Sequence, residues 1–222
     1  MRRYRAGVRL ITVRHGESTW NAAGRWQGQS DPALSELGRS QVQVLAARLA
    51  TQRIDAVVSS DLARAVETAR AIADAHGLDV ELRPDLRERD VGTWTGLTRD
   101  EIVERFPDEW AAYRDHLDPA LGGGETAREL HMRISAALRE ILAPTRGPDA
   151  TVVVVAHGGT VRAFAYATLG LVPARGRPMV ISAPANTAIS EIGSDGRGLR
   201  LHSYNDTAHL YGVGEAATAL DA

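Results

Sequence analysis

Residues 151–156 constrain the fold more than any other segment, because they place four consecutive valines between a threonine and an alanine. β-Branched side chains favour extended backbone, and a run without polar alternation is typical of a strand that is covered on both faces. Two further apolar segments, 8–13 and 56–59, have the same strand character. Strands covered on both faces occur in sheets that lie between helices, so the sequence favours an α/β fold with a mainly parallel sheet.

Amphipathic helices are predicted in the intervals between these strands. The first is expected over residues 35–50, and the second from an N-cap at Asp61 to Ala73. Two more begin at capping boxes, one running from Thr98–Glu101 to about Tyr113 and the other from Thr126–Glu129 to a stop at Pro144. The last is expected from Gly158 to Leu169. Two late strands, near 188–192 and 199–203, are expected to close the sheet. This order of elements predicts a three-layer α/β/α sandwich.

The 222 residues correspond to one large domain, which we expect to span residues 1–222. The interval from about 91 to 148 contains no predicted strand, but it contains two predicted helices joined by Gly122–Gly124. We therefore predict that a small helical cap is inserted at about 91–148 and covers one end of the sheet. The segment after Tyr211 is rich in Ala, Gly and Thr and is expected to be frayed.

Composition excludes several kinds of chemistry. All 26 positive charges are arginines, and the chain contains neither lysine nor cysteine, which excludes a P-loop lysine, a Schiff base, a thiolate nucleophile and thiolate zinc sites. The formal net charge of −2 gives no general attraction to nucleic acid or to an anionic membrane. The basic start at 1–5 lacks a following long uncharged segment, and no window reaches the roughly 18 apolar residues of a membrane span. We expect a cytoplasmic protein that binds neither nucleic acid nor membrane.

Two of the predicted strands end in a His-Gly pair. The first ends at Arg14-His15-Gly16, and the second at Ala156-His157-Gly158. Ligands of open α/β sheets bind outside the carboxyl ends of the strands, so both imidazoles should face one crevice. The third strand leads into a helix that carries Arg64 in its first turn. Two arginines, two imidazoles and helix N-termini that converge on one place suit a tetrahedral dianion such as a phosphoryl group.

At this point the sequence resembles a known family. Residues 14–21, Arg-His-Gly-Glu-Ser-Thr-Trp-Asn, are similar to the signature of the histidine phosphatase superfamily in its phosphoglycerate-mutase-like branch. Further pieces follow in the order of that family, and they lie at 27–38, 59–65, 86–96, 123–125 and 155–159. The resemblance extends from about Leu10 to Thr168. It implies the same α/β fold and a phosphatase or mutase activity.

The resemblance implies a role for each residue of the crevice. His15 matches the histidine that becomes phosphorylated, and the neighbouring arginines disfavour its cation, which leaves a nitrogen lone pair for attack. Arg14, Arg64 and His157 match the residues that hold the three non-bridging oxygens of the phosphoryl group. The implied mechanism is a ping-pong reaction through a phosphohistidine.

Four other positions complete the implied site. Glu88 matches the general acid that protonates the leaving alkoxide and later activates water, and its place four residues before Gly92 selects it from nearby carboxylates. Asn21 and Gln27 match positions that hydrogen-bond the phosphoryl group or the substrate, and Gly158 lets the backbone approach the ligand. No cluster of metal ligands is visible in the sequence, so neither a metal nor any other cofactor is expected.

Alternatives remain open at this stage. Cofactor-dependent phosphoglycerate mutases have a longer insertion with an adjacent arginine pair, whereas Glu88 and His157 are only 69 positions apart here with no such pair between them. A phosphatase of a small phosphomonoester is therefore favoured over a mutase, and a non-catalytic sensor of phosphorylated ligands is third. The substrate, and a possible homodimer, stay undetermined. Trp20, Trp94 and Tyr113 are candidates to line the substrate mouth, together with Trp110, although scattered aromatic residues more often serve packing.

Overall fold

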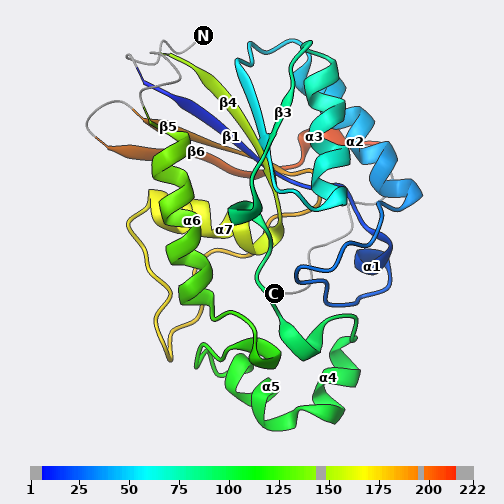
Figure 1. Ribbon diagram of the computed structural model, residues 1–222, viewed down its shortest axis with the longest axis vertical. Helices are drawn as coiled ribbons and strands as arrows, with labels where there is room; N and C mark the ends of the chain where they lie inside the picture. Colours follow the sequence, from blue (N-terminus) through cyan, green and yellow to red (C-terminus); the bar gives the residue numbers. More distant parts are fainter. Residues whose placement is uncertain (1–6, 144–148, 195–197, 214–222) are drawn as a thin grey trace.

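A computed structural model describes residues 7–143, 149–194 and 198–213 of the chain (Figure 1). The basic start at 1–5, the predicted helix stop at Pro144 and most of the tail expected to be frayed lie outside these residues. The helix expected to stop at Pro144 ends at Ile141.

Six strands form one sheet in the order β3-β2-β4-β1-β5-β6 (Figure 1). Their bounds are β1 Arg9–Arg14, β2 Ala56–Ser59, β3 Val80–Leu82, β4 Thr151–Ala156, β5 Ile189–Ser194 and β6 Leu199–Asp206. The first four run parallel to one another, β5 runs antiparallel to β1, and β6 runs antiparallel to β5. The prediction of a mainly parallel α/β sheet is confirmed.

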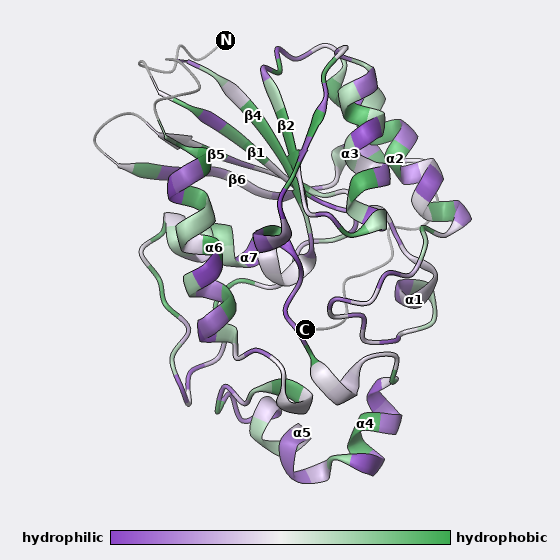
Figure 2. Ribbon diagram, viewed as in Figure 1, coloured by the Kyte–Doolittle hydropathy of each residue, from purple (hydrophilic) through white to green (hydrophobic). Residues whose placement is uncertain are grey.

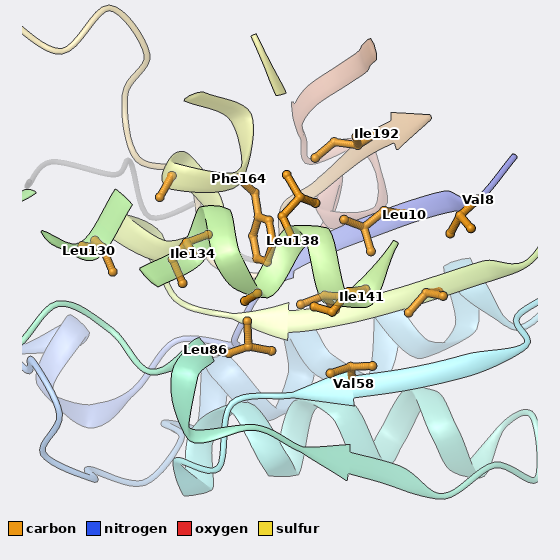
Figure 3. Close-up of a cluster of buried hydrophobic side chains, with 14 residues drawn as sticks. Val8, Leu10, Val58, Leu86, Leu130, Ile134, Leu138, Ile141, Phe164 and Ile192 are labelled. Atoms are coloured by element: carbon orange, nitrogen blue, oxygen red, sulfur yellow. The ribbon is translucent and has the colours of Figure 1, made fainter. Parts of the chain in front are cut away.

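Helices cover both faces of this sheet. On one face lie α2 (Glu36–Leu49) and α3 (Ala63–Asp74), and on the other lie α6 (Ala127–Ile141) and α7 (Gly158–Thr168). Alternate valines of β4 divide between the two faces, since Val152 and Val154 pack with α6 and α7 (Figure 3), whereas Val153 and Val155 pack with α2 and α3. Hydrophobic and hydrophilic residues alternate along α3 and α6 (Figure 2), as expected of helices with one buried face.

Two short helices lie away from the sheet, α4 (Arg99–Arg105) and α5 (Pro107–Arg114) (Figure 1). They pack on an apolar cluster of their own, which we call the aromatic cluster: Val91, Trp94, Ile102 and Leu121, flanked by Trp26, Leu97, Phe106, Trp110 and Tyr113. The interval 91–148 therefore has two parts, because α6 packs on the sheet while α4 and α5 surround the aromatic cluster.

Three sequence predictions of local structure need correction. The single helix expected from Thr98 to Tyr113 is interrupted at Phe106, because Pro107 lacks the N–H that would continue the first helix. Leu62, not Asp61, is the N-cap of α3, and the Asp61 carboxylate instead pairs with Arg87. The strand β3 was not predicted, since it has three residues and two of them are exposed. The other predicted elements stand close to their predicted places. The short helix α1 (Thr19–Ala22), which precedes α2, was not predicted.

Candidate active site

A hollow lies where the loops after β1, β2 and β4 meet, at the carboxyl ends of these parallel strands. Seven residues predicted from the sequence line it: Arg14, His15, Asn21, Gln27, Arg64, Glu88 and Gly158. The eighth, His157, is fully buried, and its ring centroid lies 5.1 Å from that of His15. The structure thus brings all eight predicted residues together from segments that are far apart in the sequence.

The hydrogen bonds of His15 define which ring nitrogen is free to attack. Its Nδ1 lies 2.6 Å from the Gly16 carbonyl oxygen, which can only accept, so Nδ1 carries the proton. Nε2 therefore holds the lone pair, and it accepts a hydrogen bond from Nε of Arg64 at 3.2 Å. Burial, followed by the charges of Arg64 and Arg14, holds the pKa of His15 well below its usual range. The imidazole is accordingly neutral, with Nε2 as its nucleophilic atom.

Two arginines lie beside His15, of which Arg64 is buried and Arg14 is half-buried. Arg64 is only 1% exposed, and its Nη1 and Nη2 donate to the carbonyl oxygens of Ser30 and Gly28, at 2.5 and 3.0 Å. Burial lowers the pKa of Arg64 to about 10, which still leaves it charged at neutral pH. Arg14 donates from Nη1 to the carbonyl of Pro184 at 2.7 Å, whereas its Nε is buried without a hydrogen-bond partner. A buried donor without an acceptor is rare, and a bound anion would supply one.

His157 is the N-cap residue of α7, and its side chain contacts Ser60, the residue that follows β2. Its Nε2 lies 2.8 Å from Oγ of Ser60, and its Nδ1 is buried without a partner. Burial, together with Arg64, His15 and Arg14, holds the pKa of His157 well below its usual range. A second neutral imidazole therefore stands beside the first, again with an unsatisfied nitrogen.

Glu88 reaches the hollow from the loop after β3. Its Oε1 accepts from the backbone N–H of Arg89 at 2.7 Å, and its Oε2 accepts from the N–H of Gly159 at 2.9 Å. Glycine at 159 allows this position of the carboxylate, because a Cβ built there would lie closer than van der Waals contact to Oε1 of Glu88. The first turn of α7 thus holds both His157 and the carboxylate of Glu88.

Amide side chains form the wall opposite this carboxylate. Oδ1 of Asn21 accepts from the backbone N–H of Ser18 at 3.1 Å, and Oγ of Ser18 donates its single proton to Oε1 of Gln27 at 2.8 Å. Asn186 donates from Nδ2 to the carbonyl of His15 at 3.0 Å and lies 3.3 Å from Oδ1 of Asn21. Since the two amide oxygens are occupied, the N–H groups of Asn21 and Gln27 are the donors that face a ligand.

The outer part of the hollow is both aromatic and cationic. Trp26 and Tyr113 line it, together with the buried arginines Arg89 and Arg162. A second hollow continues from the first, because Arg89, Tyr113 and Arg162 line both. Of the four aromatic residues considered at the mouth, Tyr113 lies there, whereas Trp94 is fully buried in the aromatic cluster.

Sequence reasoning missed several polar residues of this site. Ser60 lies inside a segment that matched the family, but a serine after a strand has no recognisable spacing to His157. Asn186 and Arg162 come from segments without a motif, and only the tertiary fold brings them near His15. Within the described residues, no group of three or more His, Asp or Glu side chains could hold a metal ion. No helix in the described segments is long and apolar enough to cross a membrane.

Comparisons with known proteins agree with this geometry. The sequence model of the histidine phosphatase superfamily (branch 1) matches residues 10–207. The chain is 38% identical over 165 residues to phosphoserine phosphatase 1 of Hydrogenobacter thermophilus, with 74% of this chain and 77% of the relative covered. It is 37% identical over 169 residues to a probable phosphoglycerate mutase of an Enterobacter species, with 74% and 76% covered. Among solved structures, the mycobacterial glucosyl-3-phosphoglycerate phosphatase is similar with a TM-score of 0.81 at 33% identity, with 91% of this chain and 100% of that chain covered.

Proposed function

Because this chain belongs to the histidine phosphatase superfamily (branch 1), we propose that it hydrolyses a small phosphomonoester through a phosphohistidine at His15, without a metal. The observation that carries the proposal is the tautomer of His15. A proton on Nδ1 and a lone pair on Nε2, beside two guanidinium groups, are what an attacking imidazole requires. This arrangement has little use in a site that only binds a ligand.

In the first half-reaction, Nε2 of His15 attacks phosphorus and the bond from phosphorus to the ester oxygen breaks. Arg14 and Arg64 neutralise the charge of the three non-bridging oxygens, and His157 helps to orient them. The unpartnered Nε of Arg14 and Nδ1 of His157 thereby gain acceptors. Asn21 and Gln27 donate to the same group. Glu88 gives its proton to the departing ester oxygen, which leaves as an alcohol.

In the second half-reaction, water is the acceptor. Glu88, now a carboxylate, removes a proton from water as the oxygen attacks phosphorus, and the bond to Nε2 breaks. Inorganic phosphate leaves and His15 returns to its neutral tautomer. The N–H groups of Arg89 and Gly159 hold the Glu88 carboxylate in both steps.

The outer hollow suggests which alcohols fit. Arg89 and Arg162 are buried, and together with Tyr113 and Glu88 they line the hollow into which the leaving alcohol would extend. Guanidinium groups that line the hollow beyond the phosphoryl site favour an alcohol that carries a carboxylate. The names of two relatives, a phosphoserine phosphatase and a glucosyl-3-phosphoglycerate phosphatase, denote esters of this type. We propose this substrate class for the present chain.

The test is ³¹P NMR of the purified protein in a chelator, with 3-phosphoglycerate, a trace of bisphosphoglycerate, phosphoserine and several sugar phosphates. Growth of the inorganic phosphate signal, fastest from a carboxylate-bearing ester, is the expected result. Acid-labile, base-stable phosphate on the quenched protein should accompany it and should be absent from His15→Ala.

Three other results would contradict the proposal. Conversion of 3- to 2-phosphoglycerate without free phosphate would indicate a mutase, in which a second hydroxyl replaces water. Binding of the esters without turnover would indicate a sensor. Activity that is lost in the chelator and restored by Mg²⁺ would contradict the metal-free chemistry.

A further inference from the structure

Arg133, on α6, makes an unusual set of contacts with the backbone of the loop that carries Glu88. Its Nη1 donates to the carbonyl oxygens of Asp85 and Arg87 at 2.8 and 2.9 Å, and its Nη2 lies 3.3 Å from the carbonyl of Glu88. One guanidinium group thus joins three of four successive residues, 85–88. Arginine is suited to this task, because its donors are fixed in one plane.

Glu125 holds this guanidinium in place. Its two carboxylate oxygens accept from Nε and Nη2 of Arg133 at 2.9 and 2.7 Å, and the two side chains are 20% and 22% exposed. The backbone of Glu125 is itself tied to the same loop, since its carbonyl accepts from Nε of Arg89 at 2.8 Å and its N–H donates to Asp90 at 2.9 Å. The pair forms a bridge from α6 to both sides of Glu88.

The carboxylate of Glu88 needs such support, because the hydrogen bonds that it accepts from the described residues come only from backbone groups. Its Oε1 accepts from the residue that follows it, Arg89, so this bond moves with the loop. Only the N–H of Gly159 is fixed independently, by α7. The direction of the Glu88 side chain therefore depends on where the loop backbone is held.

We infer that Arg133 and Glu125 are positioning residues, which fix the Glu88 loop so that its carboxyl meets the leaving oxygen of the ester. The inference rests on the proposed function, because it assigns Glu88 as the general acid. Neither Arg133 nor Glu125 touches the phosphoryl site in this arrangement. In kcat/KM, which reports the first half-reaction, their effect should appear only where proton transfer to the leaving group limits the rate.

The test is Arg133→Lys, measured with a series of aryl and alkyl phosphates of increasing leaving-group basicity. Lysine keeps the positive charge, and hence the field at His157, but its single ammonium cannot span three carbonyls and a carboxylate. For alkyl phosphates we expect kcat/KM to fall by about 10- to 100-fold, since displacing a reacting group by about 1 Å costs on the order of 100-fold. For p-nitrophenyl phosphate, which needs no acid, the loss should stay below about threefold.

Arg83→Lys is the matched control. Arg83 also joins this loop to α6, through Asp85 and Glu140, but it does not contact the backbone of Glu88. We expect the same leaving-group dependence as in the wild type. Glu125→Gln is the second variant, and it serves as the test if circular dichroism shows that Arg133→Lys does not fold. It should show the pattern expected of Arg133→Lys, but more weakly.

Glu88→Gln separates this inference from the proposed function. If Glu88→Gln lowers kcat/KM equally for all leaving groups, Glu88 is not the general acid, and the proposed role of Glu88 is overturned. If it becomes steeply dependent on the leaving group while Arg133→Lys and Glu125→Gln do not, only the positioning inference is overturned. The double variant Glu88→Gln/Arg133→Lys should be no slower on alkyl phosphates than Glu88→Gln, because a positioning residue has nothing left to position. Additive losses would also overturn the inference.

Discussion

His15 illustrates how a single side chain is prepared for chemistry by what surrounds it. A histidine in water is partly protonated near neutral pH, and the protonated form has no lone pair to attack with. Burial and two arginine charges remove that form, and the Gly16 carbonyl selects the tautomer. The same arginines are the groups that would bind the phosphoryl oxygens. In the proposed mechanism, one cluster of charges therefore both keeps the nucleophile neutral and binds the phosphoryl group that it attacks.

Gly159→Ala adds one methyl group beside the Glu88 carboxylate and so tests whether the position of this carboxylate matters for the reaction. The new Cβ would collide with Oε1 of Glu88, which is the flexible end of a side chain, so the carboxylate should swing away while the fold stays intact. We expect kcat/KM for alkyl phosphates to fall by about 100-fold, because the general acid is displaced. The free energy of unfolding should change by less than about 1 kcal/mol.

Gly158→Ala is the neighbouring comparison. A Cβ at 158 would meet ordinary contacts at 3.5 and 3.6 Å, from Ala183 and from Arg14. Its loss of activity should be several-fold smaller than that of Gly159→Ala. Equal losses in the two variants would mean that the start of α7 is merely sensitive to any side chain, and that Glu88 was not displaced.

The residues that we propose to contact the phosphoryl group could be predicted from the sequence, whereas those that support them could not. Arg14 ends β1, and His15 and His157 directly follow β1 and β4, so strand order alone brings them together. Arg133 resembles any exposed helix arginine in the sequence, because the carbonyls that it binds belong to a loop 45 to 48 positions away. Contacts from side chain to distant backbone leave no periodic signal.

At the scale of elements, the aromatic cluster connects α4 and α5 to the mouth of the hollow. Trp94 is its centre, with ring centroids 5.3 to 5.9 Å from those of Trp26, Trp110 and Tyr113. Two of these neighbours, Trp26 and Tyr113, also line the hollow. The packing of the cluster therefore determines where the outer wall of the site lies.

Trp94→Ala should damage both stability and substrate binding. Loss of a fully buried indole costs about 3–5 kcal/mol of unfolding free energy, and the freed space lets Trp26 and Tyr113 move, so KM should rise more than kcat falls. Trp94→Phe should cost much less, because the buried Nε1 of Trp94 has no hydrogen-bond partner to lose. Urea denaturation and steady-state kinetics measure both. A Phe variant as unstable as the Ala variant would show that the indole N–H is satisfied.

Element order was the most predictable feature of this chain, and element ends were the least. The valines of 151–156 and the two capping boxes, Thr98–Glu101 and Thr126–Glu129, are local signals, and each lies where it was expected. The break at Pro107 was also visible in the sequence, but the amphipathic pattern on both sides of it favoured one helix. β3 depends on pairing with β2 alone, so its three residues had no strand signal of their own.

At the scale of the whole molecule, the sheet forces two neutral histidines into one buried site, and this has a thermodynamic consequence. The pKa values of His15 and His157 are both held well below the usual range, whereas in the unfolded chain they return to about 6.5. Below that pH the unfolded chain binds protons that the folded chain does not. The contribution of these two histidines to the free energy of unfolding is therefore complete above about pH 7, and it decreases as the solution becomes more acidic.

We expect the free energy of unfolding to decrease from pH 7 to pH 5 by up to about 1.4 kcal/mol per pH unit for each of these histidines. Urea titrations should be made in a buffer without phosphate, because a bound anion would stabilise the folded state. The variant His15→Gln/His157→Gln should have a shallower slope over this range. His131 and His209, whose pKa values are lowered chiefly by burial, remain in it and retain part of the dependence. Equal slopes for the wild type and the variant would mean that both site histidines are protonated in the folded protein, and a protonated His15 has no lone pair with which to attack phosphorus.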